Sequence, residues 1–350
     1  MIARLKAIAA LTAAGMALFA ATPLRADDAA TAKFYAGKTI IMSVGSGVGS
    51  GGDTYARLIA QFISKHIPGN PTVVVENMPA AGGLVHMNQM YKQAKRDGTA
   101  IGLTRESMPF EPLLLGSASK AAFDVAKINW LSSPNSFPNV AVAWHTSKVK
   151  TAADLRKEQL IVGGIGQTGS TNDAYVLNNL LGFKFKVING YPGPAEIDLA
   201  METGELEGRA TAGWTGLTTR HPDWLAEKKV NILYQTGFVK YPSIPDSVPS
   251  LLDLADTEEQ RTILKLKYAS NAVGFPFFAP PEVPKDRVDA LRKAFVDTYA
   301  DAEFKAAAAA QKVDVFPVGP EDMAKIYAEA YAAPPEMIAR LAELSRPSAK

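Results

Sequence analysis

Two glycine-rich loops carry the residue pattern with the clearest chemistry in this chain. The first loop has five glycines within eight residues, Gly45 to Gly52, and Asp53 behind it suits a helix N-cap. A short apolar run before the loop, Thr39 to Val44, predicts a buried strand. A strand, a glycine loop and a helix N-terminus together present free backbone N–H groups and the positive end of a helix dipole. The sequence therefore predicts an anion site at this loop.

The identity of the anion is open on these residues alone. Gly47, Gly49 and Gly52 fit the pattern G-x-G-x-x-G, and a second apolar run ends at Glu76, 24 residues after Gly52. Dinucleotide-binding domains have this arrangement, but a lone match is weak and the acid usually follows after about 20 residues. A small carboxylate, a nucleotide and a tight turn that binds nothing are all compatible with the pattern.

A second loop of the same kind lies about 115 residues further along, from Gly163 to Asn172. It again follows an apolar run, and Ser170 with Asp173 gives the S-x-x-D signature of a helix capping box. Neither loop contains Lys or Arg before Arg57, so an anion there would depend on N–H groups and hydroxyls, which suit a polyphosphate poorly. A dinucleotide enzyme needs one such loop, whereas a protein that holds a dicarboxylate between two lobes has a use for two.

Catalytic and metal-binding patterns are absent from the sequence. The histidines His66, His86, His145 and His221 are scattered, with no H-E-x-x-H and no pair at i, i+4 spacing. There is no G-x-S-x-G nucleophile elbow. We therefore expect no catalytic residues, no metal site and no cofactor.

The elements that position the loops alternate between strands and helices, which predicts an α/β fold with mainly parallel sheets and ligands at the carboxyl ends of the strands. A chain of 350 residues is long enough for two domains. Segments rich in Pro, Ser and Asn near residues 129–139 and 268–284 suggest crossings between them, and Val313 to Phe316 suggests a short strand. We expect one lobe from residues 36–134 and 268–350, and a second from residues 135–267.

The first 26 residues have the composition of a secretory signal peptide. Arg4 and Lys6 precede an apolar run, Ala7 to Ala21, that is short for a membrane span, and cleavage is expected after Ala26. An uncleaved membrane anchor is the alternative. Removal of this segment leaves 34 of the 37 basic residues against 35 acidic ones, which gives no general attraction for nucleic acid. The chain has no cysteine. We expect a periplasmic protein.

The order and spacing of several segments resemble the periplasmic solute-binding proteins of tripartite tricarboxylate transporters, the Bug family. The resemblance covers about Ala36 to Ala342, and it is carried by GSGGDTYARLIA, VVVENMPAAGG, GQTGSTNDAY, GYPGPAEIDLAMETGELEG and APPEVPKDRVDALRKAF. It implies a Venus-flytrap fold in which two α/β lobes close on a carboxylate. It also implies that loops of both lobes hold the ligand through main-chain amides, hydroxyls and ordered water.

Carried over by position, the resemblance places the ligand between residues 46–53 and 166–171. Two departures from the family are the larger number of glycines in the first loop and Asp173, which stands where the family often has His. Trp214 is interpreted either as a lid over the ligand or as core, and Arg209 either as structural or as ligand-binding. The predicted ligand-binding residues are Ser46, Gly49, Ser50, Gly51, Gly52, Asp53, Thr104, Gln167, Thr168, Gly169, Ser170, Thr171 and Trp214.

These observations predict a monomeric solute-binding protein for a mono-, di- or tricarboxylate, aromatic acids included, with the membrane subunits of a tripartite tricarboxylate-type transporter as partners. Two rivals stay open. One is an exported oxidoreductase that uses Gly47 to Gly52 and Glu76 for a dinucleotide. The other is a ligand-sensing subunit that docks to a receptor kinase.

Overall fold

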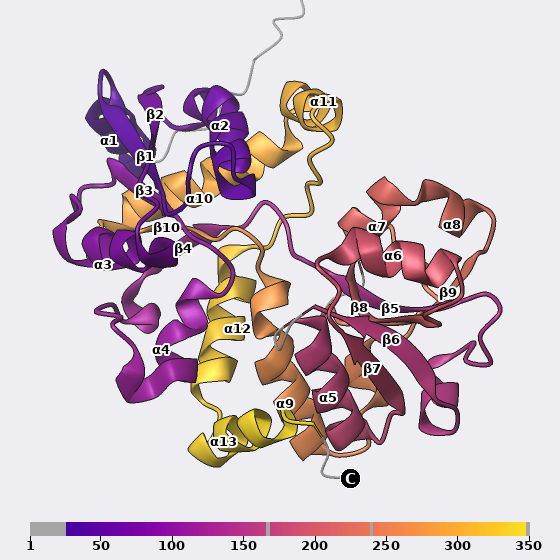
Figure 1. The fold of residues 1–350 in the computed structure, drawn as a ribbon. Coiled ribbons are helices and arrows are strands. Elements are labelled where there is room, and N and C mark those ends of the chain that lie inside the picture. Colours follow the sequence, from indigo (N-terminus) through magenta and orange to yellow (C-terminus); the bar gives the residue numbers. More distant parts are fainter. Residues whose placement is uncertain (1–25, 166–168, 239–240, 348–350) are drawn as a thin grey trace, which may run out of the picture.

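The computed structural model describes residues 26–165, 169–238 and 241–347. Two α/β lobes stand side by side, each built on its own five-stranded sheet (Figure 1). This confirms the two-lobed α/β fold that the sequence predicts. Within the described residues, no helix is both long enough and apolar enough to cross a membrane.

The sheet of lobe 1 has the strand order β2-β1-β3-β10-β4. Strand β1 lies parallel to both β2 and β3, so their carboxyl ends meet at one edge. Strand β10 is antiparallel to β3 and to β4. The strands are β1 (Thr39–Val44), β2 (Thr72–Asn77), β3 (Ala100–Leu103), β4 (Asn129–Ser132) and β10 (Phe277–Ala279).

The sheet of lobe 2 has the order β7-β6-β8-β5-β9. Strand β6 is parallel to β7 and β8, whereas β5 is antiparallel to β8 and β9. Both sheets are therefore mixed, because β5 and β10 enter from the other lobe and do not belong to a strand–helix–strand unit. The strands are β5 (Asn139–Trp144), β6 (Leu160–Gly164), β7 (Phe185–Asn189), β8 (Gly208–Gly213) and β9 (Val230–Gln235).

Helices cover both faces of each sheet. In lobe 1, α1, α2, α10 and α11 share one apolar core with the strands, and α3 and α12 share the core on the other face. In lobe 2, α5 and α9 cover one face, and α6, α7 and α8 cover the other. The helices are α1 (Ala26–Tyr35), α2 (Gly51–Ile63), α3 (Leu84–Gln93), α4 (Glu111–Leu115), α5 (Ser170–Leu181), α6 (Pro194–Glu202), α7 (Trp214–Arg220), α8 (Pro222–Ala226), α9 (Glu258–Tyr268), α10 (Lys285–Ala300), α11 (Ala302–Ala310), α12 (Pro320–Tyr331) and α13 (Pro335–Leu344).

Two segments, residues 133–138 and 270–276, cross between the lobes, and a third, residues 312–318, joins α11 to α12 beside them and contacts lobe 2. The first two are joined by hydrogen bonds from Phe137 N–H to the Asn271 carbonyl (2.8 Å) and from Gly274 N–H to the Asn135 carbonyl (2.9 Å). The strand expected at residues 313–316 is wrong: only an isolated bridge forms there, between Val318 and Ser133. Pro317 has no N–H to donate, which limits the pairing of this segment.

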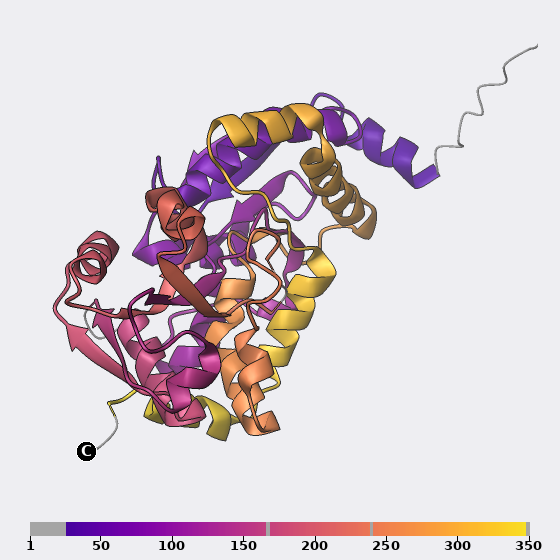
Figure 2. The ribbon, with the colours of Figure 1, turned by 90° about the vertical axis from the view of Figure 1, so that its right-hand side faces the viewer.

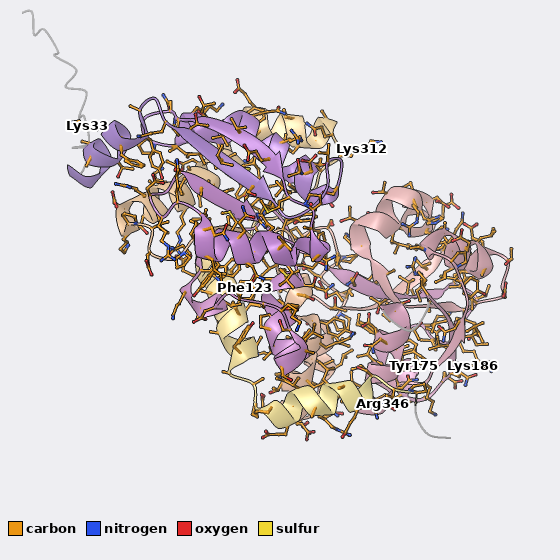
Figure 3. The ribbon with its side chains drawn as sticks, turned by 60° about the vertical axis from the view of Figure 1, so that its left-hand side comes forward. Lys33, Phe123, Tyr175, Lys186, Lys312 and Arg346 are labelled. Atoms are coloured by element: carbon orange, nitrogen blue, oxygen red, sulfur yellow. The ribbon has the colours of Figure 1, made fainter. Side chains whose placement is uncertain are left out.

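The C-terminal helices tie the lobes together on one side. Helices α9 and α12 lie side by side in both views (Figures 1 and 2), and a core cluster on this side includes residues of α3, α9, α12 and α13. The Asn179 side chain of α5 donates to the Arg346 carbonyl at 2.9 Å, so the last described residues lie on lobe 2. Figure 3 shows Arg346 at the same end of the molecule as Tyr175 of α5. The predicted lobe boundaries stay a prediction.

Candidate functional site

The first glycine loop connects β1 to α2 and is closed by its own side chains. Helix α2 begins at Gly51, and Ser50 is its N-cap, with its Oγ accepting from Asp53 N–H at 3.3 Å. The prediction that Asp53 is the N-cap is therefore wrong. Asp53 lies in the first helical turn and reaches back instead, where its carboxylate accepts from Gly49 N–H at 2.8 Å. The hydroxyls of Ser46 and Ser50 lie 2.6 Å apart.

Asp53 is the centre of this network and is almost fully buried. Both of its oxygens accept from Arg57 Nε at 3.0 Å, and Asn77 Nδ2 donates to it and to the Ser46 carbonyl at 2.9 Å. Burial by itself would raise the pKa of Asp53, but the hydrogen bonds from Arg57, Gly49 and Asn77 outweigh burial and lower it. Asp53 is thus a carboxylate that shapes the loop, with its charge compensated by Arg57.

Two glycines in this loop are required by the geometry. Gly49 has a φ of +79°, a conformation that side chains with a Cβ rarely adopt. At Gly52, a Cβ would lie 3.0 Å from a Leu103 methyl carbon and 3.1 Å from Ser46 Oγ. Among the described residues, no hydrogen-bond acceptor faces the backbone N–H groups of Gly51 and Gly52 at the start of α2. These two donors make the loop receptive to an anion.

The second loop follows β6 and leads into α5. Gly166, Gln167 and Thr168 lie outside the described residues, so the structure does not place these predicted ligand contacts. Gly169, with a φ of +58°, is the N-cap of α5, and Ser170 is the first helical residue.

The capping box expected from Ser170 and Asp173 is wrong. The buried Ser170 hydroxyl has no partner among the described residues, and the Asp173 carboxylate forms an ion pair with Lys267 Nζ at 2.7 Å. Lys267 extends from α9 and gives Asp173 a cationic partner, whereas a capping contact would give it only a neutral N–H donor. The Ser170 hydroxyl is left as a donor that a ligand in this loop could use.

The floor of the second loop is formed by Gly164, Thr171 and Asn189. Thr171 Oγ1 donates to Asn189 Oδ1 at 2.8 Å, and a Cβ on Gly164 would come within 2.4 Å of both oxygens. Only glycine fits at this strand end, because Asn189 at the end of the neighbouring strand β7 leans over it.

The remaining predicted residues are buried. Thr104 follows β3, is 1% exposed, and its hydroxyl has no partner among the described residues. Trp214 is 3% exposed, packs in the core of lobe 2 and donates from Nε1 to Ser243 Oγ at 2.6 Å. Arg209 forms a buried ion pair with Asp198 at 2.7 Å, which fits the structural interpretation of this residue.

Both lobes contact segment 312–318 at Asp314. The Tyr55 hydroxyl of α2 donates to the Asp314 carbonyl at 2.5 Å, and Thr215 Oγ1 of α7 donates to its carboxylate at 2.7 Å. Among the described residues, no hydrogen bond or ion pair joins residues 46–53 to residues 169–171. The structure thus brings Ser46, Gly49, Ser50 and Asp53 of the first loop together, and no polar contact joins them to the described part of the second loop.

Sequence reasoning missed Asn77, Asn189 and Phe275 as supports of these loops. Asn77 and Asn189 end the strands next to β1 and β6, and an amide at such a position is a detectable signal once strand order is known. Phe275 packs so close to Gly51 that a Cβ there would lie 2.9 Å from its ring. No local pattern identifies Phe275, because it returns from the other lobe. Arg57 could have been assigned from its i, i+4 spacing to Asp53.

No group of three or more His, Cys, Asp or Glu side chains within the described part of the chain could hold a metal ion. A cavity of about 370 Å³ does occur beside the two crossings and segment 312–318, but none of the predicted ligand residues that the structure describes lines it. We base the candidate site on the two strand-end loops, because their free donors suit an anion and the cavity lies elsewhere.

The sequence matches no family model and no curated protein. The structure is similar to a TctC solute-binding protein from Polaromonas, with a TM-score of 0.64 and 17% identity over 88% of this chain and 97% of that one. It is also similar to a Rhodopseudomonas palustris protein solved with adipate, with a TM-score of 0.52 and 16% identity over 88% and 97% of the chains.

A third similar structure is described as a periplasmic transporter, with a TM-score of 0.50 and 21% identity over 87% of this chain and 96% of that one. The fold is therefore that of the two-lobed solute-binding proteins. Within that class, it is the fold of the TctC type, which agrees with the resemblance seen in the sequence.

Proposed function

We propose that this protein is an exported solute-binding protein that captures a small organic carboxylate between its two lobes and delivers it to a tripartite tricarboxylate-type transporter. The ligand class comprises mono-, di- and tricarboxylates, aromatic acids included. The protein acts as a monomer in the periplasm, and its partners are the membrane subunits of the transporter. It carries out no reaction and uses no cofactor.

The observation that supports this function best is the first loop. It offers the backbone N–H groups of Gly51 and Gly52 at a helix N-terminus, beside the hydroxyls of Ser46 and Ser50. The cation nearest to these donors in the sequence, Arg57, is already paired with Asp53. Neutral donors of this kind suit a carboxylate better than a polyphosphate, which needs a cation in the loop.

The second loop supports a ligand with more than one polar end. It starts α5 in the other lobe, and its Ser170 hydroxyl has no partner among the described residues. Two helix N-termini, one from each lobe, can hold opposite ends of one dicarboxylate. Adipate, the dicarboxylate bound to the similar R. palustris protein, is a ligand of this class.

Thermal unfolding with a panel of ligands tests this function. A carboxylate at 100 times its Kd stabilises the folded protein by about 2.7 kcal/mol, which raises the Tm by a few degrees. We expect a rise with one class of carboxylate and none with NAD(H). The variant Gly51→Trp, whose side chain collides with Phe275, should lose the rise. A rise with NAD(H) and with no acid would support the oxidoreductase instead.

A ligand-sensing role uses the same site and differs in the partner. Uptake of the identified acid by cells that lack this protein separates the two functions. A solute-binding protein predicts loss of uptake, whereas a sensor predicts normal uptake and loss of the transcriptional response.

A further inference from the structure

The cavity beside the crossings, which we call the hinge pocket, is built from three parts of the chain. The two crossings and segment 312–318 contribute Ser136, Pro138, Asn271, Ala272, Phe316, Pro317 and Val318. Lobe 2 contributes Gly237 and Phe238 after β9 and Lys265 of α9, and α12 contributes Asp322, Lys325, Ile326 and Glu329. A volume of about 370 Å³ lies at the lower end of the range for small-molecule sites.

The hinge pocket is separate from the first glycine loop. Phe137 makes an edge-to-face contact with Phe275, the ring that packs on Gly51. The residues on either side of Phe137, Ser136 and Pro138, line the pocket instead. Phe137 thus contacts the ring that packs on the first loop, while its two neighbours in the chain line the pocket.

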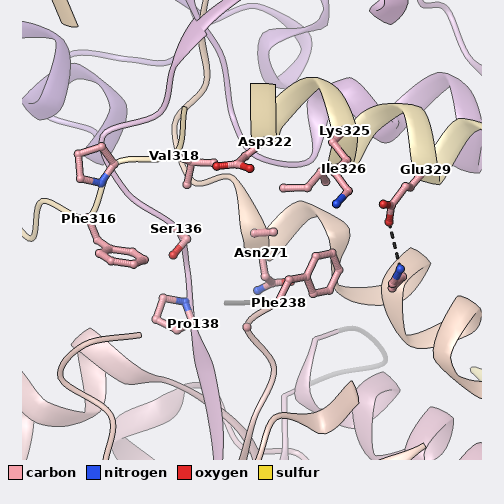
Figure 4. A pocket seen from close by; sticks show the side chains of 14 residues that line it. Ser136, Pro138, Phe238, Asn271, Phe316, Val318, Asp322, Lys325, Ile326 and Glu329 are labelled. Carbon is pink, nitrogen blue, oxygen red and sulfur yellow. Dashed lines mark hydrogen bonds and ion pairs between the residues drawn. The ribbon is translucent and has the colours of Figure 1, made fainter. Parts of the chain in front are cut away.

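The interior of the hinge pocket is apolar and its rim is charged. Figure 4 shows the rings of Phe238 and Phe316 on two sides of the pocket, with Ile326 above it. The rings suit the apolar body of a ligand. An apolar wall with a few polar groups at one edge is the usual composition of a site for a small organic molecule.

The rim carries one ion pair and, in addition, one cation and one anion that form no ion pair with another side chain in the described part of the chain. Lys265 and Glu329 form an ion pair at 3.2 Å, drawn as the dashed line in Figure 4. Asp322 and Lys325 also border the pocket, and within the described residues neither forms an ion pair with any other side chain. They are three residues apart, so they lie on the same side of α12. Their charges cancel, which disfavours a simple anion or a simple cation.

We propose that the hinge pocket binds a small zwitterion with an apolar body, the chemistry of an α-amino acid with an aromatic or large aliphatic side chain. Lys325 pairs with the carboxylate of this ligand and Asp322 with its ammonium group. The side chain of the ligand lies between Phe238, Phe316 and Ile326. This site is independent of the proposed carboxylate site between the lobes.

Calorimetric titration of the purified protein with L-phenylalanine and L-leucine tests this proposal. We expect binding of at least one of them, and about tenfold weaker binding of 3-phenylpropanoate and 2-phenylethylamine, each of which lacks one of the two charges. No binding of either amino acid at about 10 mM would overturn the proposal, because a Kd above that concentration is weaker than the Kd of ordinary metabolite sites. Equal binding of 3-phenylpropanoate would overturn the zwitterionic class.

Charge variants assign the binding to this pocket. Asp322→Lys and Lys325→Glu should each weaken binding about tenfold, and the exchange Asp322→Lys with Lys325→Asp should restore part of it. Glu321→Lys is the matched control, since Glu321 is an exposed acid in the same helical turn that does not line the pocket. Full binding in both single variants would contradict the proposal, as would an equal loss in Glu321→Lys.

The variant Gly51→Trp separates this site from the one between the lobes. Amino-acid binding should persist in Gly51→Trp while carboxylate binding is lost. Loss of both would show a single shared site and would overturn the inference, whereas failure of the carboxylate panel alone would leave amino-acid binding at the hinge pocket intact.

Discussion

At the scale of single residues, the buried polar groups behind the first loop predict how the stability of the protein depends on pH. His86 of α3 is fully buried, and neither ring nitrogen has a hydrogen-bond partner of good geometry among the described residues. The ring packs against the backbone of Gly45, where a Cβ would lie 2.9 Å from Nδ1. Burial lowers the pKa of His86 to about 4, and a backbone interaction with Ser43 offsets this only in part.

The buried His86 predicts a pH dependence of stability. The unfolded chain, with a His pKa of 6.5, binds more protons than the folded one between pH 6.5 and about 4. The free energy of unfolding should therefore fall as the pH falls through this window, by roughly 3 kcal/mol in total. Urea unfolding of the wild type and of His86→Met, compared at pH 7, 5.5 and 4, measures it. Parallel losses in the two proteins would show that His86 does not cause the fall.

Asp53 also predicts a loss of stability as the pH falls, but it stabilises the fold in its charged form. Asp53→Asn keeps the shape of the side chain but removes the charge that Arg57 and Gly49 N–H contact, so we expect a loss of about 1–3 kcal/mol at pH 7. Because the pKa of Asp53 is lowered in the folded state, its contribution is present above the unfolded pKa of 3.8 and is lost as the pH falls below it.

Denaturation of the wild type and Asp53→Asn at pH 7 and pH 3 measures both effects. The gap between the two proteins should narrow at pH 3. A gap that stays constant would mean that the carboxylate charge is not what stabilises the loop, and Arg57→Ala should then also be neutral.

At the scale of elements, sequence periodicity located the parts of both loops well. The strand from Thr39 to Val44 has the predicted ends, and a strand and a helix flank the second loop as predicted, although β6 extends to Gly164 and α5 begins at Ser170, both inside the predicted loop. The helix caps were predicted less well, because the carboxylates of Asp53 and Asp173 each form an ion pair, which is a stronger interaction than a hydrogen bond from a capping N–H group. Arg57 is local to Asp53 and could be foreseen, whereas Lys267 comes from a helix 94 residues away.

The supports that come from distant segments of the chain could not be predicted. Phe275 packs on Gly51, and Asp314 accepts from Tyr55 and Thr215, and all these contacts join segments far apart in the chain. Their positions depend on how the crossings run between the lobes, which no local pattern encodes. The mixed character of the sheets has the same origin, since β5 and β10 are the strands that follow crossings.

The conformation of the first loop gives a prediction at this scale. Gly49→Ala should destabilise the protein by about 1–2 kcal/mol, because the φ of +79° is unfavourable for alanine although the space around it is open. Gly47→Ala is the matched control, since residue 47 has no positive φ and its nearest neighbour would lie 4.0 Å from the new Cβ. Chemical denaturation of both variants measures the difference, and equal effects would contradict the strained geometry described for Gly49.

At the scale of the whole molecule, the proposed capture of one ligand by both loops requires that the lobes move. Each loop presents donors from its own lobe, and among the described residues no polar contact joins them in this structure. A ligand that contacts both loops would stabilise an arrangement in which they are closer, with rotation absorbed by the crossings at 133–138 and 270–276.

One contact should oppose or limit that rotation. Thr215 of lobe 2 holds the side chain of Asp314 at 2.7 Å, while Tyr55 of lobe 1 holds its carbonyl. If closure breaks the Thr215 contact, Thr215→Val should tighten carboxylate binding; if closure keeps it, binding should weaken. Calorimetry on this variant, with Thr218→Val as a control on the same helix, shows whether the link moves. Unchanged affinity would mean that Asp314 does not couple the lobes.

Small-angle X-ray scattering with and without a stabilising carboxylate tests the central claim most directly. If two lobes close on the ligand, the radius of gyration should fall at saturation, and it should stay unchanged in Gly51→Trp at the same concentration. Binding of the carboxylate without any decrease in the radius of gyration would contradict capture between the lobes.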